Sequence, residues 1–271
     1  KIYMGISRLF LKEFLEICIF SKDTNIKKNE TAKILFLGDQ SIRVNTNQIN
    51  NAAKFLKSKK NKNLYLFDRL RKATLHDFFP TDIRSKLIIK TLDINGKPDL
   101  NVDITRKKSL NESGLLIGSI SHFIDIGTLE HVINPYKALC NISDLIKKGG
   151  LISHLSPCSS YLNHGYYCIS PQLLHDFYLS KGFKILRFRT LSYIGNYDTK
   201  YSLCFNLNYN HDVEMKGLKS TLRGRHFKDF LDSLLRRVFL RLCRETYISF
   251  TAIKLPTNTK SNFTLYQKQY E

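Results

Sequence analysis

The sequence predicts an α/β fold in which helices cover both faces of a mostly parallel, doubly wound sheet. Short apolar runs closed by glycine or an acid alternate with polar, helix-compatible stretches along the 271 residues. The first run, residues 32–38 (AKILFLG), is typical of a strand buried on both faces of a parallel sheet. Right-handed crossovers between such strands place helices on both faces and ligands at the carboxyl ends of the strands.

The apolar runs locate the strands. They predict strands at residues 32–38, 86–93, 115–126, 151–155, 184–191 and 247–255. The last run alternates apolar and polar residues, so we expect it to be antiparallel and to lie at the end of the sheet.

Two helices have clear signals. Asn134 is a suitable N-cap and Pro135 suits the first helical position, so a helix is expected to begin there and to end at Gly149-Gly150. Lys147 and Lys148 would then complement the negative end of its macrodipole. A second helix, residues 171–179, is expected to begin at a proline.

These elements suggest a division of the chain. We expect an N-terminal helical extension at residues 1–30, a main domain at 31–255 and a disordered tail at 256–271. Residues 216–244 carry nine basic residues against two acids and predict a basic helical insertion before the last strand. Its apolar stripe would pack on the core or rest on a membrane surface.

Composition narrows the class of protein. The net charge is +20, from 43 basic and 23 acidic residues, which suits nucleic-acid or anionic-membrane binding but also follows from an AT-rich coding bias. The six cysteines are scattered, without the close spacing of zinc sites, and are expected to be reduced. No apolar stretch reaches the roughly 18 residues of a membrane span, and no signal peptide is recognisable, so a cytoplasmic protein is expected.

Two segments carry a family resemblance. Residues 123–157 read FIDIGTLEHVINPYKALCNISDLIKKGGLISHLSP and residues 164–178 read HGYYCISPQLLHDFY. Over about residues 32–190 the chain resembles class I S-adenosylmethionine-dependent methyltransferases, in particular a subgroup with G-T-L-E-H-V, K-x-G-G and H-G-[FY]-[YF]-x-[FI]-S-P in this order. The resemblance implies a Rossmann-like fold, S-adenosylmethionine as cofactor, and methyl transfer to an oxygen or nitrogen of a small molecule or glycan precursor.

The resemblance also implies where the cofactor binds. Asp93 ends the second predicted strand, where a carboxylate can accept hydrogen bonds from both ribose hydroxyls; such an acid can equally be a helix cap. Asp103 matches an acid near the adenine amino group and can also be a plain turn residue. The full set of expected cofactor contacts is Gly38, Asp39, Gln40, Asp93, Ile94, Asp103, Asp125 and Gly127.

The first loop departs from the family pattern. The usual multi-glycine loop is reduced to Gly38-Asp39-Gln40-Ser41, where Gly38 would let the backbone approach the cofactor. This departure favours an alternative hypothesis, a catalytically eroded methyltransferase-like protein that acts as a scaffold or binding partner. A second alternative is RNA or anionic-surface binding through residues 216–244; nucleic acid is an allowed partner but is not favoured.

Three residues are the candidates for catalysis. His164 would accept a proton from the acceptor hydroxyl, while Glu130 and His131 would lie near the transferred methyl group; His164 can also simply shape a turn. Some relatives bind a divalent metal with a further acid three residues before the glutamate, where this chain has Gly127. Glu130 and His131 alone offer two ligands, so no metal is expected. Tyr166 and Tyr167 would line the acceptor pocket or lie in the core.

Overall fold

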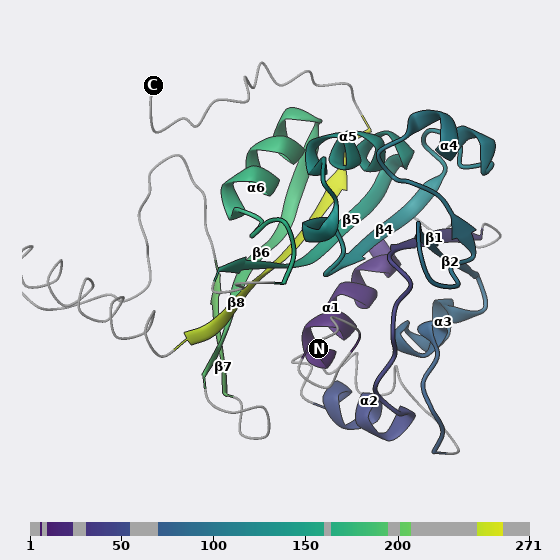
Figure 1. Cartoon of the computed structure of the whole chain (residues 1–271). Coiled ribbons are helices and arrows are strands. Elements are labelled where there is room, and N and C mark those ends of the chain that lie inside the picture. Colours follow the sequence, from purple (N-terminus) through teal and green to yellow (C-terminus); the bar gives the residue numbers. More distant parts are fainter. Residues whose placement is uncertain are drawn as a thin grey trace, which may run out of the picture.

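The computed structural model describes residues 6, 10–23, 31–54, 70–159, 164–194, 201–206 and 243–256. Within these residues, eight strands form one sheet in the order β3-β2-β1-β4-β5-β8-β6-β7 (Figure 1). The strands are β1 (Ala32–Leu37), β2 (Leu87–Asp93), β3 (Leu100–Asn101), β4 (Ile120–Ile126), β5 (Ile146–Ser159), β6 (Phe183–Ile194), β7 (Tyr201–Asn206) and β8 (Cys243–Lys254). Strands β1 to β5 pair in parallel, whereas β8 is antiparallel to both β5 and β6.

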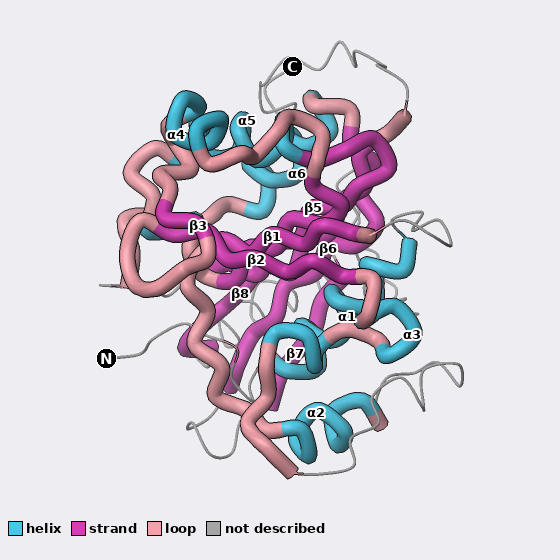
Figure 2. Tube along the Cα trace, turned by 90° about the vertical axis from the view of Figure 1, so that its right-hand side faces the viewer, coloured by secondary structure: helices cyan, strands magenta, loops and turns pink. Residues whose placement is uncertain are grey.

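Helices cover both faces of the sheet, as the sequence predicts (Figures 1 and 2). They are α1 (Leu11–Phe20), α2 (Thr46–Ala53), α3 (Thr81–Arg84), α4 (Lys107–Glu112), α5 (Pro135–Leu145) and α6 (Pro171–Ser180). One apolar core lies between the sheet and the α1–α2 layer, and a second lies between the sheet and α4, α5 and α6. The predicted doubly wound, mostly parallel α/β fold is therefore confirmed.

The N-terminal helix α1 packs directly on the sheet. Phe14 contacts the ring of Phe36 on β1, and the acids that interrupt its apolar pattern, Glu13 and Glu16, both pair with the buried Arg187 of β6. A buried guanidinium needs such partners, since an uncompensated charge in the core is costly. These ion pairs explain why a helix with an apolar face carries acids on its buried side.

The last strand is antiparallel, as predicted, but its predicted position at the end of the sheet is wrong. Strand β8 lies between β5 and β6, with Ser153 opposite Thr251 and Arg187 opposite the same Thr251 on the other side. Its central residues are buried on both faces of the sheet. Beyond β6 the sheet continues with β7, a strand that the sequence analysis did not predict.

Helix α5 begins at Pro135 with Asn134 as its cap, as predicted, but ends at Leu145 rather than at Gly149. Ile146 already belongs to β5, where it pairs with Ile120 of β4. The lysines expected in the last helical turn therefore lie in a strand. The cation at the helix end is instead Lys254 of β8, whose Nζ donates to the carbonyl oxygens of Ser143 and Ile146 at 2.7 and 2.9 Å.

Several predictions concern residues outside the described part of the chain. The basic insertion at 216–244 falls in this category except for its last two residues, and the tail at 256–271 does so except for its first residue. The division of the chain into these parts stays a prediction. Among the described residues, no helix is both long and apolar enough to cross a membrane. Four described cysteines, Cys18, Cys140, Cys158 and Cys168, carry free thiols.

Candidate active site

The carboxyl ends of β1, β2 and β4 meet at one edge of the sheet, at the point where the strand order reverses. Leu37 of β1 lies opposite Leu92 of β2 on one side and Asp125 of β4 on the other. Ligands of doubly wound sheets bind in the crevice at such a point. The residues that follow these strands therefore form the candidate site.

The loop after β1 is closely packed around Gly38. This residue has a positive φ of 89°, and a Cβ there would lie 2.3 Å from Thr128 Oγ1 and 2.9 Å from Gln40 Nε2. Both groups donate to the carbonyl oxygen of Leu37, at 3.2 and 2.7 Å. Internal packing by itself thus requires glycine at position 38, and Gln40 and Thr128 occupy the space beside its Cα.

Asp93, at the end of β2, connects the loops after the first two strands. Its Oδ2 accepts from the Asp39 amide at 2.8 Å, and its Oδ1 accepts from the amides of Ile94 and Asn95 at 2.7 and 3.1 Å. Asp39 in turn accepts from the Lys97 amide at 2.9 Å. Carboxylate oxygens accept more than one hydrogen bond, so Oδ2 keeps capacity for a hydroxyl donor. Next to it, the side chain of Ile94 is exposed.

Asp103 organises the turn that follows β3. Its Oδ1 accepts from both the amide and the hydroxyl of Thr105, at 2.9 and 2.7 Å, and its Oδ2 lies 3.2 Å from Arg106 Nε. These contacts are those of an Asx turn. The predicted adenine contact at Asp103 stays a prediction.

The Asp125 side chain points into the protein interior. Its Oδ1 accepts from the amides of Thr128 and Leu129, and its Oδ2 accepts from the Ser156 hydroxyl and pairs with His154 Nδ1 at 2.8 Å. Asp125 is fully buried. These four contacts fix the turn at Gly127, which has a positive φ of 66°, and so position the residues that follow it.

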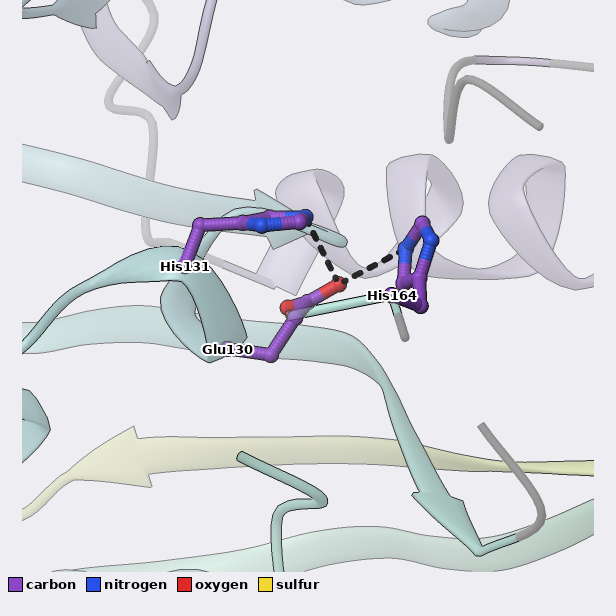
Figure 3. Close-up of side chains that lie close together, drawn as sticks. All are labelled: Glu130, His131 and His164. Carbon is purple, nitrogen blue, oxygen red and sulfur yellow. Dashed lines mark ion pairs between the residues drawn. The ribbon is translucent and has the colours of Figure 1, made fainter. Parts of the chain in front are cut away.

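The single helical turn after β4, Leu129–His131, carries the first two candidate catalytic residues (Figure 3). The Glu130 side chain is fully buried and its Oε1 lies 3.9 Å from His131 Nε2 and 3.8 Å from His164 Nε2. The two imidazole rings meet edge to face with centroids 5.1 Å apart. The structure thus brings together all three residues that the sequence analysis named for catalysis.

The H-G-Y-Y segment is fixed against Glu130 through the backbone. The carbonyl oxygen of Glu130 accepts from the amides of Tyr166 and Tyr167 at 2.9 and 3.2 Å. A Cβ at Gly165 would lie 3.0 Å from this oxygen and 3.1 Å from Glu130 Cγ. The glycine thus permits the close approach that brings His164 to the carboxylate.

The pKa values of Glu130 and His131 both depart from their ordinary values. Burial, together with the nearby Asp125 carboxylate, raises the pKa of Glu130 well above its usual range. Burial also lowers the pKa of His131, an effect that Asp125 partly opposes. The cluster therefore favours a neutral imidazole at His131 at pH 7.

An apolar rim borders this cluster. Tyr166 and Tyr167 are exposed, so the alternative that placed them in the core is wrong. Tyr167 donates its hydroxyl hydrogen to the carbonyl oxygen of Ile133 at 2.8 Å, and Ile133 and Tyr136 are themselves exposed. Exposed apolar side chains grouped near polar groups are typical of a ligand-binding surface.

Two residues of the site were not named by the sequence analysis. Thr128 lies within the G-T-L-E-H-V segment, but only the structure shows that its hydroxyl donates to Leu37 and so bridges the ends of β4 and β1. Tyr247 comes from β8, far along the chain; burial raises its pKa, and so does the nearby charge of Glu130. No spacing rule connects a residue of the last strand with Glu130.

A separate pocket of about 480 Å³ borders the loop after β1. It is lined by Gln40, Ser41, Ile42, Lys72, Ala73, Thr74, Leu75, His76 and Ile89. Of the candidate cofactor contacts, this pocket includes only Gln40.

Comparisons with known proteins give similar folds only. No protein-family model and no curated protein matches the chain. Similar solved structures include a SAM-dependent methyltransferase from Archaeoglobus fulgidus (13% identity, 92% of this chain and 95% of that chain, TM-score 0.45) and a putative methyltransferase from Bacillus halodurans (10%, 90% and 98%, 0.44). A putative sarcosine dimethylglycine methyltransferase from Galdieria sulphuraria is 15% identical over 91% of this chain and 86% of that chain, with a TM-score of 0.42. At these identities and scores, nothing about activity follows for this chain.

Proposed function

We propose that this protein is an S-adenosylmethionine-dependent methyltransferase that methylates an oxygen or nitrogen of a small molecule or glycan precursor. One observation carries the proposal: Asp93 ends β2 and Glu130 follows β4, the two strands that flank β1 at the edge where the strand order reverses, and His131 and His164 lie beside Glu130. This arrangement supports a nucleoside site and a reactive cluster at the same edge of the sheet. The motif resemblance supports the same activity.

The residues after β1 and β2 fit such a cofactor. Asp93 Oδ2 keeps capacity for a ribose hydroxyl, and the exposed Ile94 offers an apolar surface beside it. Gln40 Oε1 is buried and accepts no hydrogen bond from the described residues, so it offers an acceptor to an ammonium group. When bound, S-adenosylmethionine supplies an electrophilic methyl group on a sulfonium.

The cluster would act on the acceptor. His164 would accept the proton that the acceptor hydroxyl or amine loses, with the imidazole of His131 beside it. The carboxylate of Glu130 lies between the two rings, and the rim of Tyr166, Tyr167 and Ile133 would cover an apolar part of the acceptor. Alignment contributes most to methyl transfer, because the nucleophile and the methyl group must meet in line.

Calorimetric titration of S-adenosylmethionine and S-adenosylhomocysteine into the full chain tests the cofactor. We expect micromolar binding, weakened at least about tenfold in Asp93→Ala, which corresponds to about 1.4 kcal/mol. Glu112→Ala is the matched control, because Glu112 is an exposed acid at the end of α4. Binding that is equal in Asp93→Ala and wild type would show that Asp93 does not hold the ribose.

The crowding at Gly38 favours the eroded, non-catalytic alternative as the second candidate. Thr128 and Gln40 already fill the space beside this glycine. A wild-type protein that unfolds cooperatively yet binds neither ligand would support this alternative. The function would then be that of a binding partner.

A further inference from the structure

We propose that Glu130, His131 and His164 form a binding site for one divalent first-row transition-metal ion. The sequence analysis expected no metal, because it found only two ligands in the segment after β4. The structure adds a third from the loop before α6, a segment 33 residues further along the chain, and brings the three ligand atoms to within 4.8 Å of one another (Figure 3).

The distances are close to those of a bound metal. Bonds of about 2.0–2.2 Å at tetrahedral angles separate neighbouring ligand atoms by roughly 3.3–3.6 Å. The two distances from Glu130 Oε1 to the histidine Nε2 atoms are 3.9 and 3.8 Å. Both of these distances exceed the expected separation by only a few tenths of an ångström, and the third pair of ligand atoms lies within 4.8 Å. Both histidines present the same nitrogen, Nε2, to the carboxylate.

An orphaned carboxylate points into this cluster. Glu130 is completely buried, and neither of its oxygens accepts a hydrogen bond from the described residues. Burial of a polar group without such a partner is destabilising, and more so for a charged group. Across the described part of the chain, the ion-pair partners of Glu130 are the two histidines and no lysine or arginine. A divalent cation would satisfy the carboxylate, and Asp125 nearby adds negative charge.

The types of ligand atom indicate which metals the site would bind. Two imidazole nitrogens and one carboxylate oxygen suit Zn²⁺ and the neighbouring transition metals, whereas Mg²⁺ and Ca²⁺ prefer oxygen ligands alone. Three protein ligands leave at least one coordination position for water or an acceptor atom. The side-chain exposure rises from 0% at Glu130 through 15% at His164 to 47% at His131, so an ion can reach the site from the His131 side.

This inference does not depend on the methyltransferase function, because metal binding can be measured without cofactor or acceptor. It does alter the role of one residue. A metal-bound Nε2 at His164 is no longer available as the proton acceptor, so His164 would be a ligand in the metal-loaded protein.

The test uses the full chain, treated with chelator and then titrated with Zn²⁺ by calorimetry, and with Co²⁺ followed by its visible absorption. We expect one ion per chain and a Co²⁺ spectrum of low coordination number. Glu130→Gln, His131→Ala and His164→Asn should each weaken Zn²⁺ binding at least about 100-fold. His76→Ala is the control, because His76 is exposed and lies outside the cluster.

His131→Ala is the decisive variant. Its side chain is half exposed, so its loss should leave the fold intact even if a change at His164 or Glu130 does not. Wild-type Zn²⁺ affinity in a folded His131→Ala protein would overturn the proposal, as would wild-type binding that His76→Ala weakens equally. Absence of binding to wild-type protein would overturn it too, while leaving the cofactor titration to test the methyltransferase function separately.

Discussion

Asp125 and His154 lie directly opposite each other on the paired strands β4 and β5, and Asp125 Oδ2 is 2.8 Å from His154 Nδ1. Both side chains are fully buried. The other imidazole nitrogen, Nε2, is 2.8 Å from the hydroxyl of Tyr178 on α6, so the network joins the sheet to the helix layer. Because Asp125 also fixes the turn that precedes Glu130, this pair connects the core with the candidate site.

Replacement of Asp125 by alanine should destabilise the protein strongly. The change removes a buried acceptor of four contacts and leaves His154 and the amides of Thr128 and Leu129 without it. We expect the free energy of unfolding to fall by about 3–5 kcal/mol, measured by urea denaturation. Ser156→Ala, which removes a single 3.2 Å donor to the same carboxylate, should cost only about 1 kcal/mol. Equal costs for the two variants would contradict this account.

Gly165→Ala should impair the site more than the fold. The new Cβ would press on the carbonyl oxygen and Cγ of Glu130, at 3.0 and 3.1 Å, and shift His164 away from the carboxylate. Displacements below 1 Å at a reacting group cost roughly tenfold to a hundredfold in rate. We expect at least tenfold weaker Zn²⁺ binding or methyl transfer with a small change in melting temperature.

Gly114→Ala is the control for this effect. A Cβ at Gly114 meets nothing within 4 Å, but its φ of 77° makes alanine unfavourable by about 1 kcal/mol. This variant should lose stability without loss of binding or activity. The reverse pattern in the two variants would show that the close approach at Gly165 is not needed.

Lys254→Met should weaken the end of α5. The methionine keeps an apolar stem but loses the ammonium that donates to the carbonyl oxygens of Ser143 and Ile146. We expect a loss of about 1–2 kcal/mol in urea denaturation, because charged donors at helix carboxyl ends are stabilising. Lys148→Met, at an exposed residue of β5, should change the free energy of unfolding by less than about 0.5 kcal/mol. A larger loss of stability in Lys148→Met than in Lys254→Met would instead support a helix that continues to Gly149.

The free energy of unfolding should decrease as the pH is lowered, over a pH range set by His122. Burial lowers the pKa of His122 to about 3, from an ordinary value of 6.5, and the ring pairs with the hydroxyls of Ser21 and Ser153 at 2.8 and 2.9 Å. Between these pH values the unfolded chain binds a proton that the folded chain does not, so stability decreases as pH falls from about 6.5 toward 3. The slope from this residue approaches 1.4 kcal/mol per pH unit.

His122→Gln isolates this contribution. Glutamine keeps a donor and an acceptor for the two serines but does not titrate in this range. Urea denaturation at pH 7, 6, 5 and 4 should show a smaller loss of stability per pH unit in the variant than in wild type. The difference in slope should correspond to at most one bound proton per molecule. Parallel curves for the two proteins would show that His122 is protonated equally in both states.

The strand and helix positions were largely predictable because they depend on local patterns. The end of α5 was an exception. Glycine at 149 is a good termination signal, yet the helix ends at Leu145 because Ile146 pairs with Ile120 in the sheet. A local signal cannot show that a neighbouring strand competes for the same backbone groups.

The sequence by itself determined the α/β alternation, the strand-end residues Asp93 and Glu130, and the H-G-Y-Y segment, since each follows from residue type and spacing. Tertiary structure placed β8 inside the sheet, filled the space beside Gly38 with Gln40 and Thr128, and brought His164 to Glu130. The physical reason is that strand order and close contacts between loops depend on packing between residues far apart in the chain. Periodicity along the chain reports which face a residue occupies, but not which distant residue lies beside it.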